Sequence, residues 1–325
     1  MTLHVFADHG AMLPETAGVD LAGLPGVRYT GYRQQRLPGF SARLYQVLHI
    51  LSRPFNLALS AWFVRRFNRR LAVDPFELQE GLSCVGEGDA VLWINPSLAV
   101  YPVVEALRRR RVRLSVYFVD PVHRLGLAAS QVRDWAQESC VASYSPEEAA
   151  QLGLRFLVPY APVVPMATLV PDLDLVYVGS PSPKRLLWVL YLHLHLRVRQ
   201  RRGHLRLALR SQKLVRLLPG LFSGRVSFQD YAALCARSRG VLELHERDAG
   251  GVTLRATLCQ ALRRTHLCNL PTTPETTVIS LWRWRALDRF LTLETGALSA
   301  LSAPHAPHAP RVAPGFEPWL RENFG

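Results

Sequence analysis

One stretch of the chain, residues 239–269, combines a glycine pair with residue types that bind phosphate groups. Apolar side chains at 241, 242 and 244 predict a strand, Gly250 and Gly251 predict a turn, and apolar spacing over 254–262 predicts a helix. A helix N-terminus after such a turn presents free backbone N–H groups to an anion. Thr253 and Arg255, in the first helical turn, can add side-chain donors. The pattern is typical of a diphosphate-binding site and also of an ordinary strand-to-helix turn.

A second junction of this kind lies earlier in the chain. Residues 174–179 predict a strand, and a helix is predicted to begin at Lys184 and Arg185 after a loop that contains Ser180. We expect these three side chains to bind the same phosphate groups, because this is the other place where the chain offers free amides. Glu246, which follows the strand over 241–244, is a further candidate, for contacts with hydroxyl groups of a ligand bound there.

Candidate acids and bases follow predicted strands in the first half. Asp8 and His9 follow a strand over 3–7, and Asp120 follows a strand over 114–119. Ligands of open α/β sheets gather at the carboxyl ends of strands, so each of these residues can act as a general base. Each is also a common turn or capping residue.

Two patterns that resemble metal sites are weak. Asp172 and Asp174 form a D-x-D pair, but it precedes a predicted strand directly after a proline-rich segment. His193 and His195 are two residues apart in a predicted helix, which places their rings on different faces. We therefore expect no bound metal and no cofactor.

The composition sets limits on the class of protein. A chain of 325 residues with 49% apolar and 20% charged residues can form about two globular domains. The net charge of +14 favours anionic partners, although GC-rich coding would also give a chain with only two lysines and many arginines. The arginines are scattered without a nucleic-acid-binding motif, so we expect no nucleic acid as partner.

Five cysteines without a C-x-x-C pair predict reduced thiols. No signal peptide is recognisable, and together these features predict a cytoplasmic protein.

Strands and helices alternate along most of the chain, which predicts parallel sheets covered by helices. The fold class that we expect is α/β, with two Rossmann-like domains that face a cleft. The predicted boundaries are 1–160 for the first domain, 161–172 for a linker, 173–302 for the second domain, and 303–325 for an extended spacer and a terminal helix. That helix carries Trp319 and Leu320, which need a surface to pack on, so we expect it to pack back on the body.

A long basic and aromatic segment, Leu44 to Leu71, allows two interpretations. Its apolar residues recur at helical spacing and arginines surround them. Such a helix can lie on an anionic membrane, and it can equally pack on the domain with a solvated arginine face.

The order of these elements resembles the two-domain GT-B glycosyltransferases, and more narrowly a bacterial family of capsular and lipopolysaccharide biosynthesis proteins. The resemblance covers roughly residues 89–325. It rests on Phe118-Val-Asp120, the segment Ser143 to Tyr160, Gly179-Ser180, the segment Ser227 to Ser238, and Gly251-Val-Thr-Leu-Arg255. It implies transfer of a sugar from a nucleotide-diphosphate donor to a lipid-linked or polysaccharide acceptor, without a metal, in a cytoplasmic protein with possible peripheral contact with the anionic inner membrane.

One position departs from the family. The family has an acid where this chain has Leu258, and a leucine cannot accept hydrogen bonds from ribose or sugar hydroxyls. Either Glu243 or Glu246 replaces that contact, or donor binding is altered, or activity is lost. The alternative function is therefore a catalytically impaired GT-B-like binding or scaffold protein.

Overall fold

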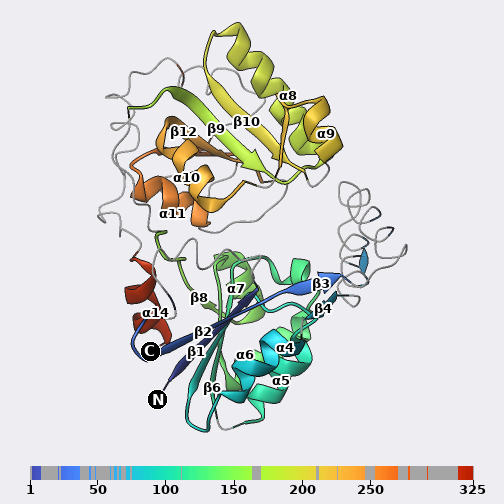
Figure 1. Cartoon of the computed structure of the whole chain (residues 1–325), viewed down its shortest axis with the longest axis vertical. Coiled ribbons are helices and arrows are strands. Elements are labelled where there is room, and N and C mark those ends of the chain that lie inside the picture. Colours follow the sequence, from blue (N-terminus) through green and yellow to red (C-terminus); the bar gives the residue numbers. More distant parts are fainter. Residues whose placement is uncertain are drawn as a thin grey trace. The chain divides into compact units, whose positions relative to one another are not determined.

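A computed structural model defines the fold as two compact units (Figure 1). Unit 1 contains residues 1–159 and 316–325, and unit 2 contains residues 160–315. The structure describes residues 2–8, 21, 23–36, 44, 48, 59, 62–63, 66, 71–73, 75–110, 112–162, 170–209, 212–224, 226–245, 253–269, 277–278, 291 and 314–324. Of the segment Leu44 to Leu71, only a few residues are among them.

Unit 1 is built on a six-stranded parallel sheet with the order β2-β1-β5-β6-β7-β8. Its strands are β1 (Leu3–Asp8), β2 (Val27–Tyr32), β5 (Ala90–Ile94), β6 (Arg113–Phe118), β7 (Cys140–Ser143) and β8 (Arg155–Phe156). Its helices are α4 (Pro75–Ser83), α5 (Tyr101–Arg108), the 3-10 turn η2 (Val122–Leu125), α6 (Ala129–Glu138), α7 (Pro146–Leu152) and α14 (Phe316–Phe324). A short antiparallel pair, β3 (Gln34–Arg36) and β4 (Leu71–Val73), lies apart from this sheet.

The central strands of unit 1 are apolar on both faces, as parallel strands covered by helices must be. Every residue of β5 is buried. On one face, Trp93 stacks on Phe6 with ring centroids 4.9 Å apart and donates its Nε1 hydrogen to the hydroxyl of Tyr32 at 2.9 Å. Buried residues of α4, α5 and α6 pack into the same cluster.

The terminal helix α14 covers the other face of this sheet. Side chains alternate along a strand, so Tyr117 of β6 points away from Val116 and Phe118, which belong to the cluster under α4, α5 and α6. The Tyr117 ring contacts the Trp319 ring at a centroid distance of 5.0 Å. Figure 1 draws α14 (red) and the α4, α5 and α6 helices on opposite sides of the sheet. The prediction that the C-terminal helix packs back on the body is confirmed.

Asp89, directly before β5, fastens the N-terminus to the sheet. Its carboxylate accepts hydrogen bonds from the backbone N–H groups of Thr2 at 2.8 Å and Gly86 at 3.0 Å, and it contacts His4 Nε2 at 3.2 Å. These backbone donors, and then His4, lower the pKa of Asp89 to about 2.

This lowered pKa predicts an acid-dependent loss of stability. Because the pKa in the folded state lies below the ordinary value of 3.8, the contribution of Asp89 is complete above that value and disappears as the pH falls towards 2. Urea unfolding of wild type, Asp89→Asn and the exposed control Asp134→Asn, from about pH 5 to about pH 2, measures it. Asp89→Asn should lose less stability on acidification than wild type or the control, and parallel curves for all three would contradict the prediction.

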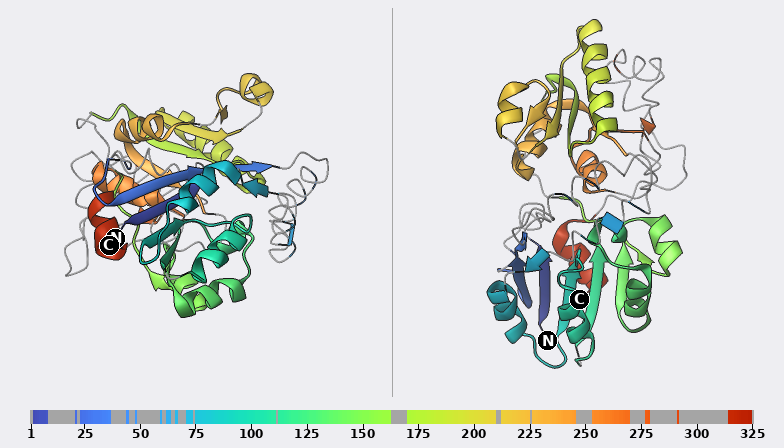
Figure 2. Two further views of the ribbon diagram at one scale, coloured as in Figure 1. Left: turned by 60° about the horizontal axis from the view of Figure 1, so that its bottom comes forward. Right: turned by 90° about the vertical axis from the view of Figure 1, so that its right-hand side faces the viewer.

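Unit 2 repeats the architecture with a sheet of order β11-β10-β9-β12-β13-β14, in which all pairs are parallel. Its strands are β9 (Leu173–Gly179), β10 (Gly203–Ala208), β11 (Phe222–Ser223), β12 (Ser238–Glu243), β13 (Thr265–Cys268) and β14 (Thr277–Val278). Its helices are α8 (Pro183–Val198), α9 (Gln212–Leu217), α10 (Phe228–Ala236) and α11 (Leu254–Ala261). Figure 2 shows both sheets from two further sides.

The two sheets, each with helices joining parallel strands, confirm the expected α/β class. Strand β9 and helices α8 and α11 begin within about two residues of the positions that the sequence predicts. The cap that Ser145 and Pro146 predict for α7 is also present, with Ser145 Oγ accepting the backbone N–H of Glu148 at 3.3 Å.

Candidate functional site

The topology of unit 2 marks the carboxyl ends of its central strands as the candidate ligand site. From β9 the chain passes to β10 and β11 on one side, and later returns to β12 and β13 on the other side. In open parallel sheets, ligands bind at the carboxyl ends of the strands where this direction changes. In unit 2 that point lies between β9 and β12, and both strands are followed by residues that we predicted to bind the donor.

Ser180 and Arg185 meet at this switch point. The Arg185 guanidinium donates to the Ser180 hydroxyl at 2.5 Å and to the Ser180 carbonyl oxygen at 3.2 Å. Its other terminal nitrogen donates to the carbonyl oxygen of Leu244, directly after β12, at 3.1 Å. Arg185 therefore joins the ends of the two strands and places a positive charge between them.

The first turn of α8 supplies the rest of this group. Ser182 caps the helix by accepting the backbone N–H of Arg185 at 3.2 Å, and Pro183 occupies the first helical position. Lys184 is exposed, and its ammonium group lies 4.8 Å from the centre of the Trp188 ring. The predicted residues Ser180, Lys184 and Arg185 thus lie together at one helix N-terminus, which attracts anions.

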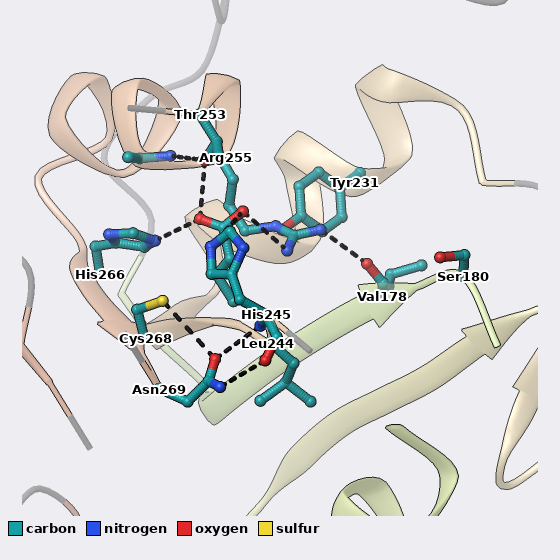
Figure 3. Close-up of polar contacts among 12 residues, drawn as sticks. Val178, Ser180, Tyr231, Leu244, His245, Thr253, Arg255, His266, Cys268 and Asn269 are labelled. Carbon is teal, nitrogen blue, oxygen red and sulfur yellow. Dashed lines mark hydrogen bonds and ion pairs between the residues drawn. The ribbon is translucent and has the colours of Figure 1, made fainter. Parts of the chain in front are cut away.

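The second predicted junction is described from Thr253 onwards. Thr253 caps α11 by accepting the backbone N–H of Ala256 at 3.2 Å, and its hydroxyl donates to Glu243 Oε2 at 2.8 Å (Figure 3). Glu246, Gly250 and Gly251 lie outside the described residues. Their assignment to the donor site remains a prediction.

Arg255 is engaged with its own domain. Its Nε donates to the Tyr231 hydroxyl at 2.6 Å, one terminal nitrogen donates to the Val178 carbonyl oxygen at 3.0 Å, and the other lies 3.7 Å from Glu243 Oε1 (Figure 3). Its side chain is 22% exposed. The guanidinium reaches the carboxyl end of β9, next to the switch point, but much of its donor capacity is already used.

Glu243 is the centre of a buried polar cluster. In the sequence, Glu243 is only a polar residue in an otherwise apolar strand, and nothing indicates the cluster. Its Oε2 also contacts His266 Nε2 at 3.0 Å, and its Oε1 lies 3.6 Å from His245 Nε2. Burial alone would raise the pKa of Glu243, but contacts with His245 and His266 and the charge of Arg255 hold it well below its usual range. The carboxylate of Glu243, which we considered for contacts with donor hydroxyls, is therefore buried in an internal ion-pair network.

Asn269 holds the loop after β12 in place. Its Oδ1 accepts the backbone N–H of His245 at 2.7 Å, and its Nδ2 donates to the His245 carbonyl oxygen at 2.6 Å (Figure 3). A side-chain amide that pairs with both backbone groups of one residue fixes that residue against the end of β13. Sequence reasoning missed this role, since Asn269 reads only as a polar residue after a strand.

Gly179 is required by the packing at the end of β9. A Cβ at this position would collide with the side chain of Tyr177, whose ring is buried. The same ring lies 5.9 Å from the Arg255 guanidinium carbon. Gly179 thus makes room for an aromatic ring next to the Arg255 guanidinium.

Leu258 is fully buried in the second turn of α11. An acid at this position would lie inside the packed unit, where an unpaired carboxylate is costly. The departure from the family pattern is therefore accommodated as an apolar core position.

The weak metal patterns have other roles. Asp172 pairs with Arg237, and Asp174 accepts a hydrogen bond from Arg239 at 3.0 Å. His195 is buried, and His193 Nε2 contacts the Leu205 carbonyl oxygen at 3.0 Å. Among the described residues, no group of three or more His, Cys, Asp or Glu side chains could hold a metal ion.

In unit 1, the candidate bases follow strands of one sheet. Asp8 ends β1 and Asp120 follows β6, with β5 between them, while His9 lies outside the described residues. Asn95, after β5, donates to Asp120 Oδ2 at 2.9 Å and accepts the backbone N–H of Asp120 at 3.1 Å. It adopts a φ of 57°, which Asn tolerates better than most residues. Asn95 is thus a positioning residue for Asp120.

A partly buried carboxyl group supports the same segment from the other side. Glu148 accepts the backbone N–H of Val122 at 2.9 Å and the hydroxyl of Ser143 at 3.0 Å. Burial raises its pKa, the donors Val122 and Ser143 oppose that rise, and the nearby charge of Asp120 adds to it. The loop that carries Asp120 is therefore fixed by Asn95 before it and by Glu148 after it.

Comparisons with known proteins identify the fold. No family model and no curated protein matches this chain. Among solved structures, the α,α-trehalose-phosphate synthase (UDP-forming) of Burkholderia xenovorans in complex with glucose-6-phosphate matches with a TM-score of 0.55 and 12% identity, over 100% of this chain and 97% of that chain. An E. coli trehalose-6-phosphate structure bound with UDP-2-fluoro glucose matches with a TM-score of 0.54 and 11% identity, over 93% and 94% of the two chains.

A third solved structure, the N-terminal domain of trehalose-6-phosphate phosphatase from Candida albicans, matches with a TM-score of 0.52 and 13% identity, over 92% of this chain and 84% of that chain. At such identities the likeness shows the fold alone. No helix among the described residues is long and apolar enough to cross a bilayer. The chain has the GT-B type of fold, with two Rossmann-like units.

Proposed function

We propose that the protein is a glycosyltransferase that moves a sugar from a nucleotide-diphosphate donor to a glycan or lipid-linked acceptor in bacterial surface-glycan synthesis. The observation that carries the proposal is the switch point of unit 2. There, Ser180, Lys184 and Arg185 surround the N-terminus of α8, beside the end of β12. This arrangement suits a diphosphate, because peptide amides and cations both face the anion.

The solved structures support the choice of donor class. One neighbour is named as UDP-forming and was solved with glucose-6-phosphate, and another is bound with UDP-2-fluoro glucose. A nucleotide sugar and a sugar-type acceptor are thus the substrates that a protein of this fold can accommodate. The choice of a lipid-linked acceptor rests on the resemblance to capsular and lipopolysaccharide proteins.

The proposed mechanism needs no metal ion. The leaving diphosphate would be neutralised by the N-termini of α8 and α11 together with Arg185, Lys184 and the partly exposed Arg255. Asp120, held by Asn95, is the first candidate for the base that deprotonates the acceptor hydroxyl, with Asp8 and His9 as further candidates. Glu246, Gly250, Gly251 and Thr253 complete the proposed donor site.

A second candidate function is a GT-B-like protein that binds a nucleotide sugar without transferring it. The burial of Leu258 favours it, since this position offers no acid for donor hydroxyls, and Glu243 is committed to an internal network. Transfer and hydrolysis assays separate the two functions. Binding with neither reaction would favour the second.

A thermal-shift screen against UDP-, GDP-, dTDP- and CMP-sugars tests the donor site. We expect one donor to stabilise the protein, and we expect Arg185→Gln to weaken its binding by about tenfold or more, because a charge-assisted hydrogen bond is lost. Arg197→Gln is the matched control, since it makes the same change on the exposed end of the same helix.

The ligand-induced shift must be compared with each variant's own unliganded melting temperature, because Arg185 also fastens Leu244. No stabilisation of wild type by any donor would remove the proposal. Equal donor-induced shifts in Arg185→Gln and Arg197→Gln would show that the donor does not bind at the switch point.

A further inference from the structure

Helix α8 is apolar on two opposite faces. Trp188, Val189, Leu192 and Leu196 are buried in the core of unit 2. Leu187, Leu190, Leu194 and Val198 are 61%, 47%, 57% and 64% exposed. Their spacing of 3, 4 and 4 residues places them in one stripe along the helix, opposite the buried face. We call these four residues the α8 stripe.

The α8 stripe exposes apolar side chains to solvent, which is energetically unfavourable. A helix that is hydrophobic all round is normally covered on both sides. Figure 1 and the right-hand view of Figure 2 show α8 (yellow-green) at the periphery of unit 2. Contiguous apolar surface at such a place marks an interaction site.

Positive charge accompanies the stripe. Helix α8 contains no acidic residue, and the exposed Lys184 and Arg197 fall on either side of the stripe at helical spacing. Two more exposed arginines, Arg199 and Arg202, follow the helix, whereas Arg201 lies 3.8 Å from Asp174. Cations at a helix C-terminus stabilise its dipole, which accounts for one or two of them. The others form a basic border around an aliphatic surface.

We propose that the α8 stripe binds the surface of an anionic lipid bilayer. The leucines and Val198 would enter the boundary between headgroups and acyl chains, and the bordering arginines would contact lipid phosphates. From Leu187 to Val198 the stripe is about 16 Å long at 1.5 Å per residue, too short to cross the hydrocarbon core but suited to lying on it.

Charge complementarity favours a bilayer over a second copy of this chain. In an antiparallel pair of α8 helices, Lys184 of one copy would face the arginines at the end of the other, and no acid of α8 could pair with them. An anionic membrane supplies the missing negative charge along the whole border.

Exposed aliphatic side chains also occur at the end of α9. The crossovers from β9 to β10 and from β10 to β11 advance in the same direction, so right-handed connections place α8 and α9 on the same face of the sheet. Leu217 ends α9 and is 71% exposed, and Leu218 is 48% exposed. Two helices on this face of the sheet thus carry exposed aliphatic side chains.

The inference gives a location to the peripheral membrane contact that the family resemblance implies, and it does not depend on sugar transfer. The first turn of α8 carries Lys184 and Arg185, two or three residues before Leu187. A membrane-bound α8 would therefore hold the proposed donor site close to the bilayer, where a lipid-linked acceptor resides.

Flotation of the full chain with vesicles tests the surface. Wild type should float with vesicles of phosphatidylcholine containing about 30% phosphatidylglycerol and stay behind with phosphatidylcholine alone, because the attraction requires anionic lipid. The double variant Leu190→Ser/Leu194→Ser should reduce the bound fraction by about tenfold or more. Val158→Ser/Val170→Ser is the matched control, since both valines are exposed outside the stripe.

A second double variant tests whether the arginines that border the stripe contribute to vesicle binding. Arg197→Gln/Arg199→Gln should weaken binding and reduce its dependence on salt, because exposed charges are screened. The proposal is overturned if wild type ignores anionic vesicles, if the leucine variant binds as well as the control, or if sedimentation shows a self-association that the leucine variant abolishes.

The two proposals fail separately. Vesicle binding without a thermal shift by any nucleotide sugar would leave the membrane surface standing and remove the transferase. A donor-induced shift without vesicle binding would do the reverse.

Discussion

Replacing Trp319 by alanine is expected to lower the free energy of unfolding by about 3–5 kcal/mol, the usual cost of removing a buried tryptophan. Trp319 is 2% exposed, contacts the Tyr117 ring at a tilted angle, and donates its indole hydrogen to the Val158 carbonyl oxygen at 2.8 Å. Its loss would leave a cavity against the sheet and an unpaired carbonyl group. Urea unfolding followed by circular dichroism measures the change.

Two variants separate the contributions. Trp319→Phe keeps most of the ring volume but loses the hydrogen bond, so we expect about 1–2 kcal/mol. Trp62→Ala is the control, because that ring is 46% exposed and its loss should cost little. If Trp319→Ala and Trp62→Ala unfold at the same urea concentration, α14 does not complete the core of unit 1.

Most buried strands and helix ends of this fold could be predicted because their signals are local. Strand β5 is a continuous apolar run, as a strand covered on both faces must be, and α7 begins at a Ser-Pro-Glu-Glu cap. The burial pattern and the capping hydrogen bonds of these elements depend on residues that are close together in the sequence. The order of strands in each sheet is not local, so the switch point became visible only in the structure.

Strand β2 shows where such signals fail. Its sequence, VRYTGY, contains an arginine and a glycine, and only Tyr32 is fully buried. An edge strand is only partly covered by other elements. Its sequence therefore lacks the continuous run of apolar residues that predicts β1 and β5. Pairing with β1 over six residues, which the chain does not encode locally, fixes it instead.

The candidate site was predictable in kind but not in detail. Residue types and spacing placed Ser180, Lys184 and Arg185 at one helix N-terminus, because glycine turns and caps are local signals. The partners of Arg255 were not predictable, since Tyr231, Val178 and Glu243 come from three other elements. Only packing decides whether such an arginine faces a ligand or its own domain.

Replacing Glu243 by alanine is expected to lower the free energy of unfolding by about 3–5 kcal/mol, the range for breaking a buried ion pair by removing one partner. Glu243 is 6% exposed and accepts the Thr253 hydroxyl, while His266 and Arg255 lie beside it. Without the carboxylate, the Arg255 charge loses its buried counter-ion. Glu138→Ala is the control, because Glu138 is 63% exposed and its pair with Arg108 should be worth at most about 1 kcal/mol.

The pH dependence distinguishes loss of charge from loss of volume. The pKa of Glu243 is lowered in the folded state, so its stabilisation is complete above its ordinary value of 4.5 and is lost as the pH falls below it. Glu243→Gln keeps the side-chain size and an acceptor for Thr253, and it should remove this acid-dependent part alone. If Glu243→Gln is as stable as wild type at neutral pH, the network does not depend on a charged carboxylate. If it also retains a donor-induced thermal shift, the contact with donor hydroxyls must come from elsewhere, with Glu246 as the remaining acid.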